Sequence, residues 1–315
     1  MRLQRSSHMA KLLLGALLLT GCAGAASAPV KLVPAPDGRY DNHAYLVDPA
    51  RMDVAQLADS IVTLVTRTTF EGPGGEVIQN EMVGSGVVLG RFVLTVEHAV
   101  ALHRIEVPSP FGPIELPTRK KAEETLIRWR GSDHPLRVLY KNRAEDIALF
   151  ELPPGIRPPS FPHPLGNSDE LRVGNFIYVV GNPMNLGINV REGIVSALRA
   201  PDEVSRIGAK GENAFMVSNG LLPGDSGTPV IAIRDGRFEL VGISQGTISQ
   251  GNRLGWVIRI NVIRNSLQSA RAALDERWTA PARILPVSAR EPAAGGMGDF
   301  LTWLTSGFKG APLNP

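Results

Sequence analysis

Cysteine is almost absent from this chain of 315 residues, since Cys22 is the only one. A lone thiol excludes an internal disulfide framework and a zinc cluster of several cysteines. Aromatic residues are also scarce, at 6%, whereas 33 glycines and 25 prolines favour many short strands and turns over long helices. The glycines follow no period of three, which excludes collagen. With 43% hydrophobic and 20% charged residues, the chain can bury a core and does not have the composition of a disordered protein.

The excess of basic charge is confined to the N-terminus. The net charge is +3, and Arg2, Arg5 and Lys11 account for it, because the first 21 residues contain no acid. The remaining 30 basic residues are matched by 30 acidic ones. The charge balance therefore gives no support to a nucleic-acid partner, and none is expected.

Residues 1–21 have the layout of a secretory signal peptide. Basic residues precede the apolar run Leu12 to Thr20, which is far shorter than the roughly 20 residues needed to cross a bilayer core. The run leads into LTGC, which resembles the bacterial lipobox, so Cys22 is predicted to be lipidated and to anchor the chain. The alternative is a cleaved signal in which Cys22 has no special role. Ala23 favours the outer over the inner membrane, with the protein facing the periplasm or the cell exterior. Residues 22–51 are predicted to form a tether.

Between Met52 and about residue 262, short apolar or alternating segments are separated by turn residues, a spacing typical of an all-β barrel or sandwich. Residues 153–164 contain six prolines and suit a connection between two β units, because proline is excluded from central strands. After Asn261, a candidate N-cap, apolar residues recur at helical spacing and predict a C-terminal helix over 262–277. The Pro/Gly-rich tail, 279–315, carries apolar residues that could dock on the domain, contact the membrane or stay disordered: Phe300, Leu301, Trp303, Leu304 and Phe308.

The segment PGDSGTPV, residues 223–230, places Ser226 on a tight turn between two glycines. Acyl transfer needs a serine hydroxyl that projects from such a turn while backbone N–H groups converge on the developing oxyanion. Gly224, two positions before the serine, lets the chain turn its amide inward. Because Gly-Asp-Ser-Gly also occurs in ordinary hairpins, Ser226 needs a base and an orienting carboxylate as well.

His98 and Asp146 are the candidates for those two roles. His98 lies at the end of the apolar segment FVLTVEHAV, and Asp146 opens the apolar segment DIALFEL. Taken singly, they read as an ordinary strand-end histidine and an ordinary turn aspartate. Together with Ser226 they predict a catalytic triad in the chain order His, Asp, Ser of the double β-barrel proteases, whereas α/β-hydrolases run Ser, Asp, His. The sequence has no H-E-x-x-H motif, and neither a metal nor a cofactor is expected.

Residues 55–275 resemble the trypsin-like serine proteases of the HtrA (Deg) type, on six phrases in the order found there: GSGVVLGRFVLTVEHAV, DIALFEL, VVGNPMNLGINVREGIVSAL, PGDSGTPV, LVGISQG and GWVIRINVI. The resemblance implies an all-β, chymotrypsin-type double antiparallel β-barrel with a C-terminal helix and the site in the cleft between the barrels. The protease domain would span 52–278, with barrel one at about 55–152 and barrel two at about 165–262.

The resemblance also implies a role for each site residue. Ser226 would be the nucleophile, His98 the general base, and Asp146 the group that holds the imidazole tautomer. Backbone amides would form the oxyanion hole, namely those of Gly224, Asp225 and Ser226. Substrate would be bound near the floor of the specificity pocket and along a strand edge, at Gly220, Gln245, Gly246 and Thr247.

Three departures from the HtrA pattern bear on these expectations. Asp225 and Thr228 replace the usual asparagine and a second glycine. In digestive relatives this aspartate pairs with an N-terminus freed by zymogen cleavage, which a lipidated N-terminus could not supply, so Asp225 needs another partner. No carboxylate lies near Gly220, which argues against Lys or Arg at the cleaved bond. The residues after the helix are too few for a PDZ domain, so regulation by such a domain is not expected.

These observations predict a lipid-anchored serine endopeptidase that cleaves unfolded or extended proteins of the cell envelope. One alternative is a non-catalytic or latent, chaperone-like lipoprotein that binds peptides on the same fold. Another is an esterase, because acyl-transfer chemistry is shared. The expected partners are protein or peptide substrates and a membrane, and the resemblance implies a homo-oligomer.

Overall fold

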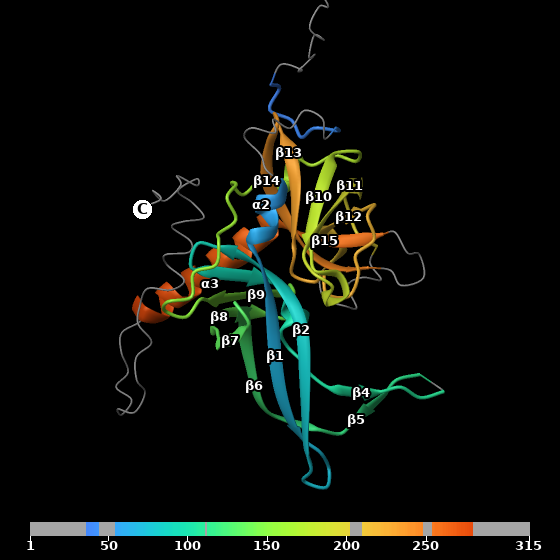
Figure 1. The fold of residues 1–315 in the computed structure, drawn as a ribbon, viewed down its shortest axis with the longest axis vertical. Helices are drawn as coiled ribbons and strands as arrows, with labels where there is room; N and C mark the ends of the chain where they lie inside the picture. Colours follow the sequence, from blue (N-terminus) through green and yellow to red (C-terminus); the bar gives the residue numbers. More distant parts are fainter. Residues whose placement is uncertain (1–35, 44–53, 111, 202–209, 248–253, 280–315) are drawn as a thin grey trace, which may run out of the picture. The chain divides into compact units, whose positions relative to one another are not determined.

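The computed structural model describes residues 36–43, 54–110, 112–201, 210–247 and 254–279 (Figure 1). The predicted signal peptide, Cys22, most of the predicted tether and the tail lie outside these ranges. Within them, no helix combines the length and the apolar character that a membrane crossing requires.

The first half of the domain is an antiparallel sheet of seven strands, in the order β7-β6-β1-β2-β3-β9-β8 (Figure 1). The short helix α2 (Val54–Asp59) leads into it. Runs of β-branched and aromatic residues favour strands, and side chains of alternate residues meet inside the sheet, among them Val62, Leu64, Val88 and Phe150. The strands are β1 (Ile61–Glu71), β2 (Val77–Leu89), β3 (Phe92–Thr95), β6 (Arg119–Trp129), β7 (Ser132–Pro135), β8 (Arg137–Asn142) and β9 (Ile147–Glu151).

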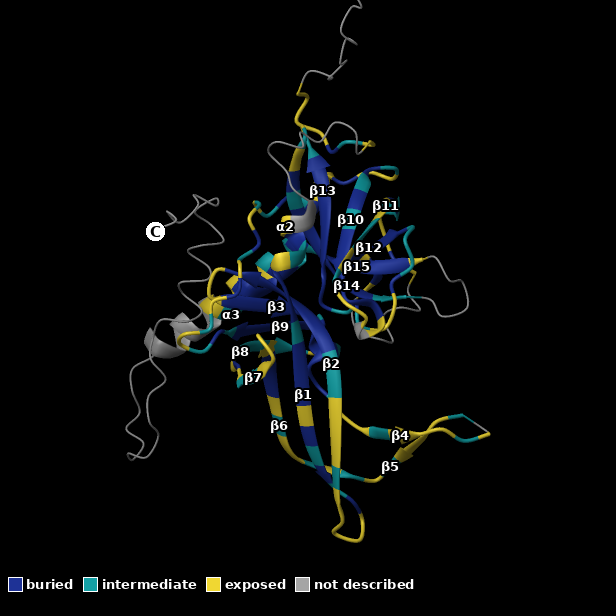
Figure 2. Ribbon diagram, in the orientation of Figure 1, coloured by how far each residue is buried: buried dark blue, intermediate teal, exposed yellow. Residues whose placement is uncertain are grey.

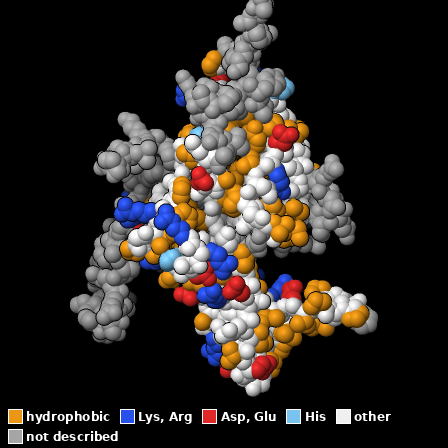
Figure 3. Space-filling view, viewed as in Figure 1, with side chains coloured by type: hydrophobic (Ala, Val, Ile, Leu, Met, Phe, Trp, Pro, Cys, Tyr) orange, Lys and Arg blue, Asp and Glu red, His pale blue; other side chains and the backbone are white. Residues whose placement is uncertain are grey.

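A separate two-stranded hairpin, β4 (Ile105–Val107) and β5 (Ile114–Leu116), follows β3 and the 3-10 turn η2 (Glu97–Ala99). It carries exposed apolar side chains, including Val107 and Ile114, and hydrophobic atoms, coloured orange, gather along this part of the surface in Figure 3.

The second half is a closed six-stranded barrel, in the order β10-β11-β12-β15-β14-β13. Its interior is filled by Ile177, Val179, Phe215, Val230 and Val257. Strands β12, β13 and β15 are buried almost throughout, whereas β11 is mostly exposed or half-buried (Figure 2). The strands are β10 (Phe176–Gly181), β11 (Asn189–Ala197), β12 (Ala214–Val217), β13 (Pro229–Arg234), β14 (Arg237–Thr247) and β15 (Gly255–Arg259). Short 3-10 turns lie at η3 (Ser168–Glu170), η4 (Pro183–Asn185) and η6 (Gly211–Asn213).

One apolar cluster joins the two halves. It includes Leu57 of α2, Leu94 of β3, Ile243 of β14 and Leu267 of the C-terminal helix α3 (Ile260–Thr279). The helix begins two residues before the predicted 262 and ends two after the predicted 277. Because this cluster contains residues of both sheets, it fixes the two halves against each other, and the all-β class with a C-terminal helix is confirmed.

The start of the ordered structure differs from the prediction. Residues 37–43, expected to belong to a tether, lie as a strap on the barrel, where Asp41 N donates to Ile233 O (2.8 Å) and Phe176 N donates to Asp41 O (2.8 Å). Tyr40 is buried in this strap and its hydroxyl donates to Glu239 Oε2 (2.8 Å). Sequence patterns missed the strap because a single buried aromatic residue has no periodicity.

Candidate active site

The three residues predicted as a triad lie within hydrogen-bond distance of one another. His98 Nδ1 is 2.7 Å from Asp146 Oδ2, and His98 Nε2 is 2.9 Å from Ser226 Oγ. The buried Asp146 carboxylate also accepts from the His98 backbone N–H (2.8 Å). A carboxylate beside Nδ1 favours the tautomer with its proton there, which leaves Nε2 as an acceptor for the serine hydroxyl.

Local backbone geometry positions each of these side chains. His98 lies in η2, immediately after the buried strand β3. Asp146 precedes β9 with φ +56°, a left-handed conformation that is uncommon outside glycine and that is often found at functional sites. Ser226 lies in the loop between β12 and β13, so the barrel supplies the predicted nucleophile, and the first sheet supplies the predicted base and its carboxylate.

The serine loop packs directly on strand β2 of the first sheet. Ser85 Oγ donates to Gly224 O (2.8 Å), and Ser85 N donates to Ser226 O (3.2 Å). Gly227 has φ +90°, and a Cβ there would lie 2.0 Å from Ser85 O and 2.1 Å from Thr95 Oγ1. Only glycine fits this close approach, which explains why Gly227 follows Ser226.

The loop before Ser226 is a tight turn. Asp225 N donates to Leu222 O (2.9 Å), while the Gly224 and Ser226 amides donate no hydrogen bond within the described ranges. This is a type II turn, because proline, here Pro223, is common at its second position, and its third position needs a positive φ, which Gly224 has at +97°. Of the three amides predicted for the oxyanion hole, those of Gly224 and Ser226 are thus available, whereas that of Asp225 is engaged within the turn.

Asp225 has the partner that the sequence alone did not identify. Its carboxylate is fully buried, and Oδ2 accepts from Arg191 Nη2 of β11 at 2.6 Å and from Leu222 N at 2.7 Å. Arg191 Nη1 also donates to Gly220 O (2.9 Å). Thr228, the other departure from the HtrA pattern, is buried and donates from Oγ1 to Asp225 O (2.7 Å).

Gln245 contacts the triad directly. Its Nε2 donates to Asp146 Oδ2 (2.7 Å), and its backbone carbonyl lies 3.3 Å from Ser226 Oγ. Sequence reasoning predicted it only as part of the substrate-binding edge. Its contact with Asp146 spans 99 positions in the chain, and no local signal indicates it.

A hollow of about 300 Å³ opens beside Ser226. His98 and Ser226 line it, together with three of the predicted substrate-binding residues. Its wall holds no carboxylate. It also includes Trp256, which was not predicted from the sequence. Gly246 allows Trp256 into this wall, because a Cβ on Gly246 would lie 2.4 Å from the indole ring. Gly220 is not part of the lining. The lining residues are His98, Leu221, Leu222, Pro223, Ser226, Gln245, Gly246, Thr247 and Trp256.

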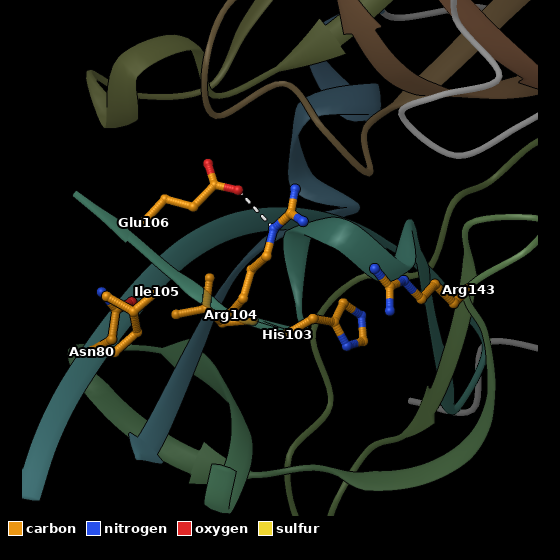
Figure 4. A pocket seen from close by; sticks show the side chains of 7 residues that line it. Asn80, His103, Arg104, Ile105, Glu106 and Arg143 are labelled. Atoms are coloured by element: carbon orange, nitrogen blue, oxygen red, sulfur yellow. Dashed lines mark ion pairs between the residues drawn. The ribbon is translucent and has the colours of Figure 1, made fainter. Parts of the chain in front are cut away.

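A second hollow, of about 400 Å³, lies near the base of the β4–β5 hairpin and shares no lining residue with the first. In Figure 4, His103 and Arg143 extend toward each other across it, while Arg104 turns to its ion-pair partner Glu106 (2.6 Å). His103 Nε2 is 2.9 Å from Glu97 Oε1. Within this lining, Arg104 and Glu106 form an ion pair, whereas the partner of His103, Glu97, lies outside it, and no described contact joins these side chains to His98, Asp146 or Ser226.

Comparison with known proteins agrees with this geometry. The family model "Trypsin-like peptidase domain" matches residues 84–243, a segment that contains His98, Asp146 and Ser226. The chain is 28% identical to the "Periplasmic pH-dependent serine endoprotease DegQ" of Escherichia coli over 63% of its own length and 37% of that protein. It is 30% identical to the "Probable serine protease do-like" of Buchnera aphidicola over 43% of its length and 27% of that protein. The matched segments are thus well under half of these relatives.

A solved structure supports the fold. The HtrA-type protease AlgW, in a serine-to-alanine variant with a decapeptide, superposes with a TM-score of 0.52 at 18% identity, covering 69% of this chain and 64% of that one. The double-barrel architecture expected from the resemblance is therefore confirmed. The chain belongs to the trypsin-like peptidase family, and within that family it is similar to the HtrA-type serine proteases.

Proposed function

We propose that this chain is a lipid-anchored serine endopeptidase that hydrolyses peptide bonds of unfolded or extended proteins in the cell envelope. The observation that carries the proposal is the contact of 2.9 Å between His98 Nε2 and Ser226 Oγ, with Asp146 on the far side of the imidazole. A merely structural serine has no need for a histidine–carboxylate pair behind it. Family membership and the named serine proteases among the relatives support the same reaction class.

The reaction follows from these positions. His98 Nε2 takes the hydroxyl proton as Ser226 Oγ attacks the carbonyl carbon, and the resulting oxyanion is held by the amides of Gly224 and Ser226. His98 then gives the proton to the leaving amine, which breaks the peptide bond and leaves an ester on Ser226. A water molecule, deprotonated by His98, hydrolyses this ester and restores the hydroxyl.

The hollow beside Ser226 supports a preference for apolar side chains at the cleaved bond. Leu221, Leu222 and Trp256 form much of its wall, and a cationic side chain would find no carboxylate there. The extended substrate itself would lie along Gln245, Gly246 and Thr247, in the manner of a strand added to a sheet.

The anchoring and location rest on sequence and on relatives. The apolar run ending in LTGC supports lipidation of Cys22, and the name of DegQ, a periplasmic protease, supports the envelope. The non-catalytic, chaperone-like alternative is less well supported, because a site that only binds peptides does not require a hydrogen-bonded triad.

The test is fluorophosphonate labelling and casein digestion by the full chain, beside Ser226→Ala. Labelling and cleavage that disappear in the variant support the proposal, and hydrolysis should fall by several orders of magnitude. Equal activity of the variant, or a folded wild type that neither labels nor cleaves, would contradict it. Matched peptide anilides with Leu or Arg before the cleaved bond test the pocket, and a nitrophenyl ester cleaved without any anilide turnover would indicate an esterase.

A further inference from the structure

Asp225 poses an electrostatic problem immediately beside the nucleophile. Its side chain is fully buried, and taking a carboxylate out of water is costly unless an opposite charge and hydrogen-bond donors surround it. Strand β10 approaches it so closely that a Cβ on Gly181 would lie 2.2 Å from Asp225 Oδ1. Water is therefore displaced on this side, and the charge must be balanced by protein groups.

Arg191 supplies that balance from within the domain. Arg191 Nη2 lies 2.6 Å from Asp225 Oδ2, while Nη1 donates to Gly220 O at 2.9 Å. The guanidinium of Arg191 thus contacts both ends of residues 220–225, the segment that lines one side of the hollow and leads to Ser226. Arg191 lies inside β11, where its backbone pairs with Val179 of β10, so the cation is carried by a rigid part of the barrel.

The turn that Arg191 supports decides where one oxyanion-hole donor points. In the turn from Leu222 to Asp225, the central peptide joins Pro223 to Gly224, and Met184 N donates to Pro223 O at 2.6 Å. The N–H and C=O of a trans peptide point in opposite directions, so a carbonyl directed to Met184 directs the Gly224 N–H the other way. Type I and type II turns differ by a flip of this central peptide.

We propose that Arg191 is a positioning residue, which holds Asp225 and thereby keeps the Gly224 N–H directed at the oxyanion. This inference rests on the proposed function, because it concerns the same reaction. In digestive relatives of this fold, the corresponding aspartate is paired by an N-terminus freed by cleavage. Here the counter-ion is a strand residue, so the site is set as the chain folds, and it requires no proteolytic activation.

The experiment compares the full chain with Arg191→Met, Asp225→Asn and the double variant, using kcat on a peptide anilide. Arg191→Met leaves a buried charge unpaired and should lower kcat by about 100-fold or more, the loss typical of one oxyanion-hole donor, with a smaller change in KM. The double variant removes both charges, and its asparagine oxygen can still accept from Leu222 N. It should therefore recover most of the lost activity.

Arg234→Met is the matched control. Arg234 is also an ion-paired arginine of the barrel, and its side chain is 19% exposed against 24% for Arg191. It should change kcat by less than about threefold, while Arg191→Lys should retain part of the activity because the charge remains. Arg191→Met with wild-type kcat, or a double variant no better than the single one, would overturn the positioning role.

A crystal structure of Arg191→Met provides a readout that does not depend on turnover. We expect Pro223 O to move out of hydrogen-bond reach of Met184 N, with the central peptide of the turn flipped. An unchanged turn would overturn the inference even if the proposed reaction is correct. Conversely, a wild type without hydrolytic activity would refute the proposed function, and the crystal structure would still decide whether Arg191 holds the turn.

Discussion

Gln245 acts on the triad through its side chain and its backbone at once. Its Nε2 donates to Asp146 Oδ2 at 2.7 Å, so this carboxylate oxygen is shared between His98 and an amide from the barrel. Its backbone carbonyl, 3.3 Å from Ser226 Oγ, is a second acceptor for the hydroxyl that His98 deprotonates in the proposed reaction. The residue therefore fixes the carboxylate from one side while it limits the rotation of the serine.

Gln245→Leu is expected to lower kcat by about tenfold. A hydrogen bond to a charged group contributes roughly 1.5–3 kcal/mol, and only part of it would be expressed in the transition state. Asp146 keeps its two contacts with His98, so complete inactivation is not expected. Steady-state kinetics on a peptide anilide measure the effect, with Gln245→Asn as a second variant that keeps the carboxamide on a shorter side chain. Wild-type kcat in the leucine variant would show that this contact does not position Asp146.

His163 is expected to make stability depend on pH. It lies edge-on to Phe161 and Phe238, with ring centroids 5.6 and 5.1 Å away, and burial lowers the pKa of its imidazole. Below pH about 6.5, the unfolded chain therefore binds a proton at His163 more readily than the folded protein does. The contribution of the neutral imidazole to the free energy of unfolding is fully present above that pH and decreases as the pH falls below it.

Thermal unfolding at pH 7.5 and pH 5.5 tests this expectation against His163→Leu. From pH 7.5 to pH 5.5, the melting temperature of the wild type should fall further than that of the variant, because the variant lacks the titrating imidazole. The other titratable groups, including the remaining histidines, are the same in both proteins, so their contributions cancel in the comparison. Identical losses would assign the pH dependence to groups other than His163.

At the scale of elements, the strap of residues 37–43 packs on the closed barrel. Tyr40 packs beneath the guanidinium of Arg234, whose carbon lies 4.1 Å from the ring centroid, and the Asn167 N–H donates to its hydroxyl (2.8 Å). Burial and the neighbouring Glu239 raise the pKa of the Tyr40 hydroxyl, so it stays protonated and can donate to that carboxylate. These contacts hold the strap on the face of the barrel that carries Arg234.

Tyr40→Ala is expected to destabilise the domain by about 3–4 kcal/mol, the cost of truncating a large buried aromatic side chain. Tyr40→Phe removes only the hydroxyl and should cost about 1 kcal/mol. Urea unfolding of the full chain, followed by tryptophan fluorescence, measures both. A Tyr40→Ala variant as stable as the wild type would mean that the strap does not contribute to the folded domain.

At the scale of the whole molecule, the site exists only because two halves meet. His98 and Asp146 belong to the first sheet, and Ser226 belongs to the barrel. The contacts of Ser85 with Gly224 and Ser226, together with the shared apolar cluster, hold the serine loop at a fixed distance from the histidine. A change that loosens this interface would therefore reduce catalysis without altering any triad residue.

The proposed membrane anchor also concerns the whole molecule. Cys22→Ser is expected to move the protein from the membrane fraction to the soluble fraction, because the thiol that accepts the lipid is removed. Fractionation of cells producing each form measures this, and Ser226→Ala should remain with the membranes. Cys22→Ser that still sediments with membranes would refute lipid anchoring through this residue.

Sequence alone was sufficient for the features that local patterns encode. Short alternating segments predicted an all-β fold, the helical spacing after Asn261 predicted α3 to within two residues at each end, and flanking residues singled out His98, Asp146 and Ser226. Strand and helix periodicity is a local property, and a serine turn needs specific glycines next to it, so both leave a signal within a few residues.

The tertiary structure alone decided which distant residues support that site. Arg191 and Asp225 are 34 positions apart, and Gln245 and Asp146 are 99 apart, so neither pair could be recognised from its neighbours in the chain. Trp256 enters the pocket wall only because the backbone of Gly246 leaves room for it. These contacts depend on strand register and on how the two halves dock, which are set by the packing of the entire core rather than by any single segment.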